Sequence, residues 1–149
     1  MNDLAMRYNN LLEQLNHKQR KYIHYRSVWN FINQLDNIQT ESEKQHCQRE
    51  LLKYLNIVEE NVDDLIDSSV TIALFNDYLY PLGNIYKKIG FIRVMPLRIA
   101  FALSTIADIL MCILFWKYPL PILATLTLIN HFMIKRKYYK KGKVYGRLY

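Results

Sequence analysis

The sequence is poor in the residues that build disulfide-stabilised, metal-binding or phosphate-binding sites. Only two cysteines, Cys47 and Cys112, occur in 149 residues, which is too few for a disulfide framework. The four glycines form no glycine-rich phosphate loop, and neither a C-x-x-C pair nor an H-E-x-x-H motif is present. The four histidines are scattered along the chain and do not supply the ligand set that zinc needs. We therefore expect no enzyme, no cofactor and no metal site.

Acidic residues are almost missing from the C-terminal part of the chain. Residues 1–86 contain 8 Lys and Arg against 12 Asp and Glu, whereas residues 135–149 contain 7 Lys and Arg and no acid. Between them, residues 94–134 carry Arg98, Asp108 and Lys117 as their only formal charges. This pattern is typical of a membrane segment attached to a polar domain. We predict an all-α protein with a helical cytoplasmic domain (1–92), a transmembrane hairpin (93–134) and a basic cytoplasmic tail (135–149).

Two predicted spans make up the hairpin, at about residues 97–116 and 118–134. A helix rises 1.5 Å per residue, so residues 99–116 reach about 27 Å and residues 118–134 about 26 Å, close to the roughly 30 Å of bilayer hydrocarbon. Basic residues flank both outer ends of the hairpin, and the connecting turn contains only Lys117. By the positive-inside rule both termini are cytoplasmic, at the inner membrane of a cell. A buried helical hairpin in a soluble complex is the alternative.

Polar residues form one stripe on each predicted span, because they are spaced by three or four positions. The stripes consist of Ser104, Thr105, Asp108 and Cys112 in the first span, and Thr127, Asn130 and His131 in the second. An antiparallel hairpin that turns near residue 118 places Asp108 level with Ile129, so the two stripes lie at one depth.

Asp108 calls for an explanation, because a carboxylate at the bilayer centre costs roughly 2.5–3.5 kcal/mol. It hydrogen-bonds Asn130 or His131 within the hairpin or across a subunit boundary, or the stripes of several subunits line a path in which Asp108 forms an acidic, cation-preferring ring. A proton relay through Asp108 and His131 is a third interpretation. Since two spans cannot enclose a pore, conduction requires a homo-oligomer.

The first 35 residues are helical by pattern, and neither proline nor glycine interrupts them. Apolar residues recur alternately every four and three positions, which is the spacing of a heptad seam. The predicted oligomerisation residues on this seam are Leu4, Tyr8, Leu11, Leu15, Tyr22, Trp29 and Ile32. The same seam would equally serve as core packing against the next helix.

A second helix is predicted to begin at Thr40, where Glu43 completes a capping box. Glu59, Asp63 and Asp67 follow one another at i,i+4 spacing on its polar face, which indicates a solvated face, a divalent-cation site or a contact with a basic tail. Residues 68–82 are too short an apolar run to cross a membrane. They extend the second helix, or they lie at the membrane interface.

The C-terminal tail combines basic and aromatic residues. Its predicted polyanion- or lipid-binding residues are Lys135, Arg136, Lys137, Lys140, Lys141, Lys143 and Arg147. They anchor the chain on acidic membrane lipid, or they capture a nucleotide or oligonucleotide, whose phosphates bind cations and whose bases stack on tyrosines.

In its architecture, a helical part followed by a two-span hairpin, the chain resembles small membrane effectors of bacterial anti-phage defence systems, such as SLATT-like or oligonucleotide-regulated effectors. The resemblance implies a homo-oligomer whose cytoplasmic helices sense a ligand or a cognate cytoplasmic protein and whose hairpins open an ion-conducting pore in membrane lipid. The alternative is a non-conducting, membrane-anchored interaction or immunity protein. A holin-like lysis protein is disfavoured, because such a protein would not need the polar half of the chain.

Overall fold

The computed structural model describes residues 3–62, 68–114 and 122–146. This part of the chain is predominantly helical, which confirms the all-α prediction at that level. The α-helices are α1 (Asp3–Gln14), α2 (His17–Tyr22), α3 (Tyr25–Gln34), α4 (Glu41–Glu60), α5 (Ser68–Leu74), α6 (Tyr80–Tyr86), α7 (Val94–Leu114) and α8 (Ile122–Ile134). The shorter elements are 3-10 helices η1 (Leu35–Asn37) and η4 (Lys87–Ile89), π-helical segments η3 (Phe75–Leu79) and η5 (Lys135–Tyr139), and strands β1 (Ile92–Arg93) and β2 (Val144–Tyr145).

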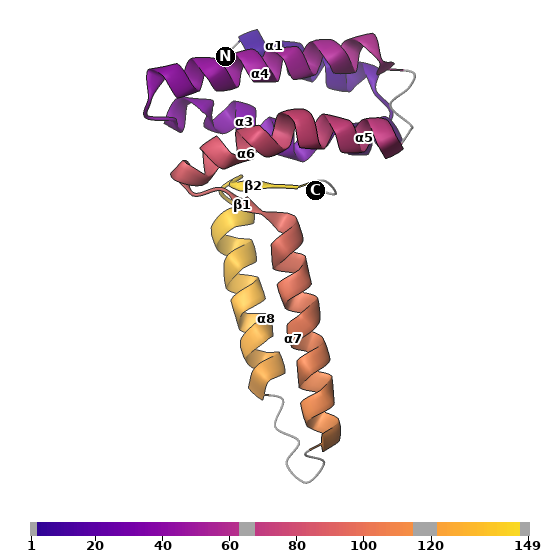
Figure 1. The fold of residues 1–149 in the computed structure, drawn as a ribbon, viewed down its shortest axis with the longest axis vertical. Coiled ribbons are helices and arrows are strands. Elements are labelled where there is room, and N and C mark those ends of the chain that lie inside the picture. Colours follow the sequence, from indigo (N-terminus) through magenta and orange to yellow (C-terminus); the bar gives the residue numbers. More distant parts are fainter. Residues whose placement is uncertain (1–2, 63–67, 115–121, 147–149) are drawn as a thin grey trace.

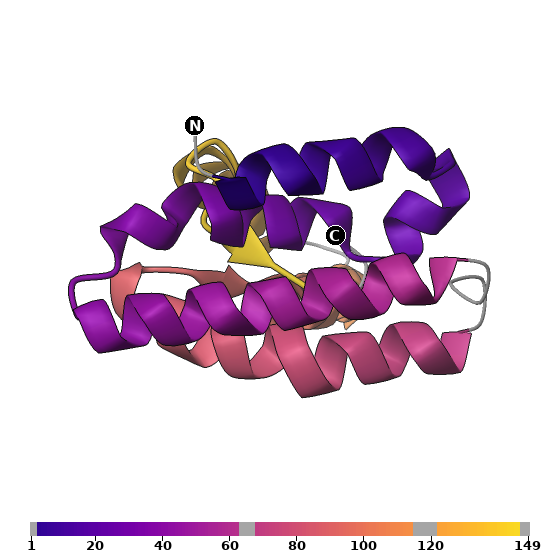
Figure 2. The same ribbon diagram turned by 90° about the horizontal axis from the view of Figure 1, so that it is seen from above.

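Helices α1 to α6 pack together as a helical body, from which α7 and α8 project side by side as a hairpin (Figure 1). Seen from above, α1 and α3 lie on one side of the body, and α4 lies beside the helix formed by α5 and α6 (Figure 2). Among the described residues, the largest fully buried side chains are those of Tyr8, Tyr54, Tyr86, Tyr145, Phe31 and Phe75. Aromatic side chains therefore supply much of the core volume, because each buries more apolar surface than an aliphatic residue.

The predicted long helix over residues 3–35 is divided into α1, α2 and α3. Asn16 ends the first run because its side-chain oxygen accepts the backbone N–H groups of Lys18 and Gln19, and the Gln19 side chain accepts the Asn16 N–H in return. The second break lies at His24, which has a positive φ of 53°. A continuous helix cannot contain that backbone conformation, so the chain reverses and the heptad seam folds back on itself.

The seam side chains are used within the body. Leu4, Tyr8, Leu11, Leu15 and Ile32 are between 0 and 5% exposed. Trp29 is 37% exposed and stacks on Tyr8, and Tyr22 is half-buried. Core packing, the second interpretation of the seam, accounts for the five buried positions, because a side chain buried in its own chain has no surface left for a partner.

The second helix begins where the sequence predicts, with Thr40 as the N-cap of α4. Its capping box does not form, since the Thr40 side chain makes no capping hydrogen bond and the Glu43 carboxylate pairs with Lys88. The buried face of α4 includes Cys47, Leu51, Tyr54 and Val58.

Residues 68–82 pack into the body. They lie in a continuous helix formed by α5, η3 and α6, and Leu74, Phe75, Leu79 and Leu82 are at most 4% exposed. Pro81 lies in the first turn of α6. Because proline has no N–H for the preceding turn, the helix widens into the π-helical segment η3 just before it.

The hairpin helices α7 and α8 pack against each other along their length (Figure 1). Within residues 3–62, 68–114 and 122–146, no helix is both long enough and apolar enough to cross a membrane. Both predicted spans, about 97–116 and 118–134, include residues of the stretch 115–121, which is outside the described residues, as is the predicted turn at Lys117.

After the hairpin the chain returns to the body. Strands β1 and β2 pair in parallel, with Ile92 opposite Val144 and Arg93 opposite Tyr145, and the Ile92 N–H donates to the Lys143 carbonyl (3.1 Å). Val144, Tyr145 and Gly146 are buried. The segment predicted as a basic tail therefore has two parts: η5, which continues α8, and residues 142–146, which pack into the body.

Candidate functional site

The hairpin presents apolar side chains to its surroundings on both helices. The exposed fractions in α7 range from 44% at Met111 to 74% at Leu114, and in α8 from 52% at Ile129 to 66% at Phe132. These exposed apolar residues are Ile99, Leu103, Ile106, Ile109, Leu110, Met111, Ile113 and Leu114 in α7, and Leu126, Leu128, Ile129, Phe132 and Met133 in α8. Large apolar side chains exposed together on both helices mark a site of protein–protein or membrane interaction.

Asp108 differs from these apolar residues, because it is only 7% exposed. Ser104 and His131 are half-buried, while Thr105 and Asn130 are exposed. Asp108, Ser104, Thr105 and His131 each have an interaction partner. The side chains of Cys112 and Thr127 are outside the described residues, and the common depth of the two stripes stays a prediction.

The basic residues gather where the hairpin meets the body (Figure 1). In and after η5, the side chains of Arg136, Lys137, Lys140 and Lys141 are exposed. Lys143 instead donates its ammonium group to the Ile89 carbonyl (2.6 Å). Of the remaining predicted anion-binding residues, the Lys135 side chain and Arg147 lie outside the described residues.

Residues 142–146, which we call the strap, fasten the two ends of the hairpin to the body. Ser27 of α3 donates its hydroxyl to the Gly146 carbonyl (3.1 Å) and accepts the Gly146 N–H (3.0 Å). Asn30, one turn further along α3, donates its amide to the Val144 carbonyl (2.8 Å). Two polar side chains of one helix face thus satisfy backbone groups of the strap that burial would otherwise leave unpaired.

The Tyr145 ring is enclosed by aromatic side chains and by the backbone of α6. Its centroid lies 5.5 Å from that of Phe31, which in turn packs against Tyr86 (4.5 Å) and Phe91 (5.5 Å). Gly83 makes room for it, since a Cβ atom there would come within 2.3 Å of the ring. Burial raises the pKa of the Tyr145 hydroxyl, and the charge of Arg93 acts in the opposite direction.

Arg93 of β1 also belongs to the junction, by which we mean the contacts that attach the hairpin to the helical body. Its guanidinium carbon lies 5.6 Å from the ring centroid of Phe75 and 5.0 Å from that of Tyr80. These are cation–π contacts. Strand β1 thereby attaches the start of α7 to η3 and α6, so both ends of the hairpin depend on the same helix of the body.

The residues of this junction were missed by the sequence analysis. No periodic sequence pattern connects the positions of these residues, which are Ser27, Asn30, Gly83 and Tyr145. One signal was available: glycine within a helix is unfavourable, so Gly83 inside a helical pattern indicates that another part of the chain approaches closely.

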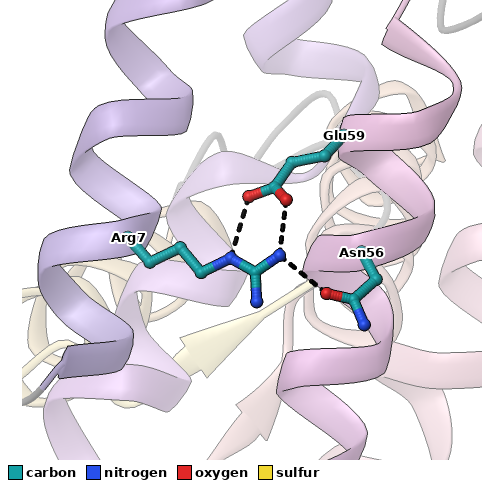
Figure 3. A network of polar contacts seen from close by, with 3 residues as sticks. All are labelled: Arg7, Asn56 and Glu59. Atoms are coloured by element: carbon teal, nitrogen blue, oxygen red, sulfur yellow. Dashed lines mark hydrogen bonds and ion pairs between the residues drawn. The ribbon is translucent and has the colours of Figure 1, made fainter.

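Glu59, the first residue of the predicted acidic row, has a partner on α1. Arg7 of α1 forms two hydrogen bonds with the Glu59 carboxylate, one of them from Nε to Oε1 at 3.0 Å, and it also donates to the Asn56 amide oxygen at 2.7 Å (Figure 3). The hydrogen bond to Glu59 raises the pKa of Arg7. Asp63 and Asp67 lie outside the described residues, and within the described ranges no three His, Cys, Asp or Glu side chains are placed to hold a metal ion.

Comparison of the chain with protein-family models, with curated proteins and with solved structures found no match. A functional assignment therefore depends on two features of the molecule: the exposed apolar hairpin and the junction that attaches it to the helical body.

Proposed function

We propose that this chain is a homo-oligomeric membrane effector of the two-span type, whose hairpins assemble into a gated ion-conducting pore in a bacterial inner membrane. The helical body remains on the cytoplasmic side and responds to a ligand or a partner protein. The observation that carries the proposal is the apolar surface of the hairpin, which is exposed on both helices.

The distribution of that surface favours lipid over a single docking partner. At 3.6 residues per turn, the exposed apolar residues of α7 cover an arc of about 200°, and Asp108 lies outside it. A helix that packs on one soluble partner normally keeps a polar face toward water. The proposal extends the hairpin through the sequence of residues 115–121, whose Trp116, Lys117 and Tyr118 are typical of a membrane surface.

Assembly of several copies is favoured by a polar side chain on the outer surface of the hairpin. Asn130 is exposed, and in lipid such a group finds a partner on a neighbouring helix. A path enclosed by several hairpins would present the stripe with Asp108 as an acidic ring that prefers cations.

The exposed lysines and arginines after α8 suit an anionic partner at the cytoplasmic end of the pore. Arg136, Lys137, Lys140 and Lys141 attract acidic lipid, or they bind the nucleotide or oligonucleotide signal of an anti-phage defence system. A cognate cytoplasmic protein would instead act on the surface of the helical body.

A second candidate function is a non-conducting, membrane-anchored interaction or immunity protein. The low exposure of Asp108, 7%, favours it, because a carboxylate enclosed by its own hairpin acts in packing rather than in conduction.

Ion flux from liposomes separates the two functions. We expect the wild-type protein to conduct, and Asp108→Asn to change the size or the cation preference of the flux, because the substitution removes the charge of the ring. Asp77→Asn is the matched control, since Asp77 is an exposed carboxylate of the body. Carbonate extraction shows that each variant is inserted. An inserted wild type that does not conduct, with or without an added oligonucleotide, contradicts the pore and leaves the anchored interaction protein.

A further inference from the structure

We propose that the strap, residues 142–146, is the coupling device of the molecule: seated on α3 and α6 it holds the hairpin in one state, and its release changes the conductance. This inference rests on the proposed function, because it concerns how the body controls the hairpin.

The strap is positioned to carry movement in both directions. On one side it binds α3 through Ser27 and Asn30. On the other side it pairs with β1, whose next residue, Val94, begins α7. Gly146 touches that residue directly, since a Cβ atom at Gly146 would lie 3.1 Å from the Cβ of Val94.

Few residues separate the strap from α8, so the strap cannot move far without moving the end of α8. Segment η5 ends at Tyr139, and the N–H groups of Gly142 and Lys143 donate to the carbonyls of Tyr139 and Tyr138 (3.2 and 3.0 Å). A displacement of α3 relative to α6 must therefore move the strap, and with it the cytoplasmic ends of both hairpin helices.

The strap and the residues that it packs against, which we call its seat, leave two buried polar atoms without a hydrogen bond in the described part of the chain. The Tyr145 hydroxyl and the Arg93 Nε are buried, and neither has a hydrogen-bond partner among the described residues. A buried polar atom without a partner weakens the state that buries it. The seated state is thus held by ring packing, by strand pairing with β1 and by four side-chain hydrogen bonds, and it is opposed by two unpaired groups, as suits a contact that must open.

Gly83→Ala tests the strap with a single methyl group. The new Cβ would lie 2.3 Å from the Tyr145 ring, and the ring cannot swing aside because it is 0% exposed and packed on Phe31. Alanine is otherwise the better residue in a helix, so the substitution unseats the strap and spares α6. Adding Tyr145→Leu removes the tip of the ring and reseats the strap. Asn84→Ala is the matched control, because it places alanine at the next, exposed position of α6.

The experiment follows amide hydrogen exchange of residues 143–146 and ion flux in the same liposomes. We expect Gly83→Ala to speed exchange of the strap at least about tenfold and to change the flux several-fold at equal insertion, with both effects reversed in the double variant and missing in Asn84→Ala. Faster exchange with unchanged flux in a conducting protein overturns the coupling and leaves the proposed function intact. Exchange as slow as in wild type overturns the seat itself. A wild type that is inserted and does not conduct contradicts the proposed function instead.

Discussion

At the scale of single residues, tyrosine hydroxyls hold the body together at its backbone irregularities. Tyr8 donates to the Tyr25 carbonyl (2.6 Å), and Tyr54 donates to the Ile23 carbonyl. These carbonyls flank His24, whose Nε2 donates to the Thr71 carbonyl (3.0 Å). The positive φ at His24 costs of order 1–3 kcal/mol, and hydrogen bonds on both sides of it offset that cost.

Tyrosine-to-phenylalanine variants separate hydroxyls that have a partner from one that does not. We expect Tyr54→Phe to lower the free energy of unfolding by about 1 kcal/mol, because a buried carbonyl loses its donor. Tyr145→Phe is the matched control and should leave the stability unchanged or raise it, since the Tyr145 hydroxyl has no hydrogen-bond partner among the described residues. Urea unfolding measures both. Equal losses in the two variants would contradict the hydrogen-bond assignment.

Cys47 makes the stability of the body sensitive to alkaline pH. Burial raises the pKa of the Cys47 thiol from 9.0 to about 11. Between these values the unfolded chain releases a proton that the folded chain retains, so the free energy of unfolding falls as pH rises from about 9 to 11. Below about pH 9 the thiol is neutral in both states and contributes no pH dependence.

The Cys47→Ala variant isolates this effect. Burial also raises the pKa values of Tyr8 and Tyr86, so the variant keeps part of the alkaline loss and should show a shallower dependence than wild type. Urea unfolding at pH 8 and pH 10 gives the comparison. The same slope in both proteins would mean that the thiol titrates alike in the folded and unfolded chain.

At the scale of elements, Asn16 decides where the first helix ends. We expect Asn16→Ala to lower the free energy of unfolding by about 1 kcal/mol, because the first N–H groups of α2 lose their acceptor. Asn10→Ala is the control: Asn10 is exposed within α1, where alanine is neutral or favourable. Thermal unfolding of the pair tests this, and an unaffected Asn16→Ala protein would show that the capping box does not hold the break.

The elements also show what can be predicted from this sequence and what cannot. The start of α4 followed from Thr40, which is its N-cap. The break at Asn16 was predictable in principle, because Asn16 and Gln19 have the spacing of a capping box. The break at His24 was not, since nothing local requires a positive φ there, and tertiary hydrogen bonds maintain it.

The candidate site likewise has one part that could be predicted from the sequence and one part that could not. The apolar hairpin was evident from composition, because long apolar runs have few alternatives. The strap was not: Val144–Gly146 is too short for any period, and its hydrogen bonds with α3 join residues more than 100 positions apart, such as Ser27 and Gly146. Only folding brings these residues together.

At the scale of the whole molecule, the basic residues of the C-terminal part and the exposed apolar residues occupy different parts of the hairpin. After Asp77 the sequence contains a single acid, Asp108, and 12 of its 20 Lys and Arg residues. The basic residues beyond η5 lie at the end of the hairpin next to the body, and the exposed apolar residues lie along its length (Figure 1). This order suits a hairpin in lipid with its basic end at an anionic membrane surface.

Cysteine labelling in vesicles tests this arrangement most directly. Leu128→Cys and Lys140→Cys are made in a chain that carries Cys47→Ala and Cys112→Ala, and a membrane-impermeant maleimide is added from the side of the body. Leu128 and Lys140 are both exposed on the protein surface, so protein burial alone does not distinguish them. We predict that the cysteine at position 140 reacts and that the cysteine at position 128 reacts only after detergent is added. Equal labelling of both positions in intact vesicles would contradict the membrane hairpin, and with it the account of function given above.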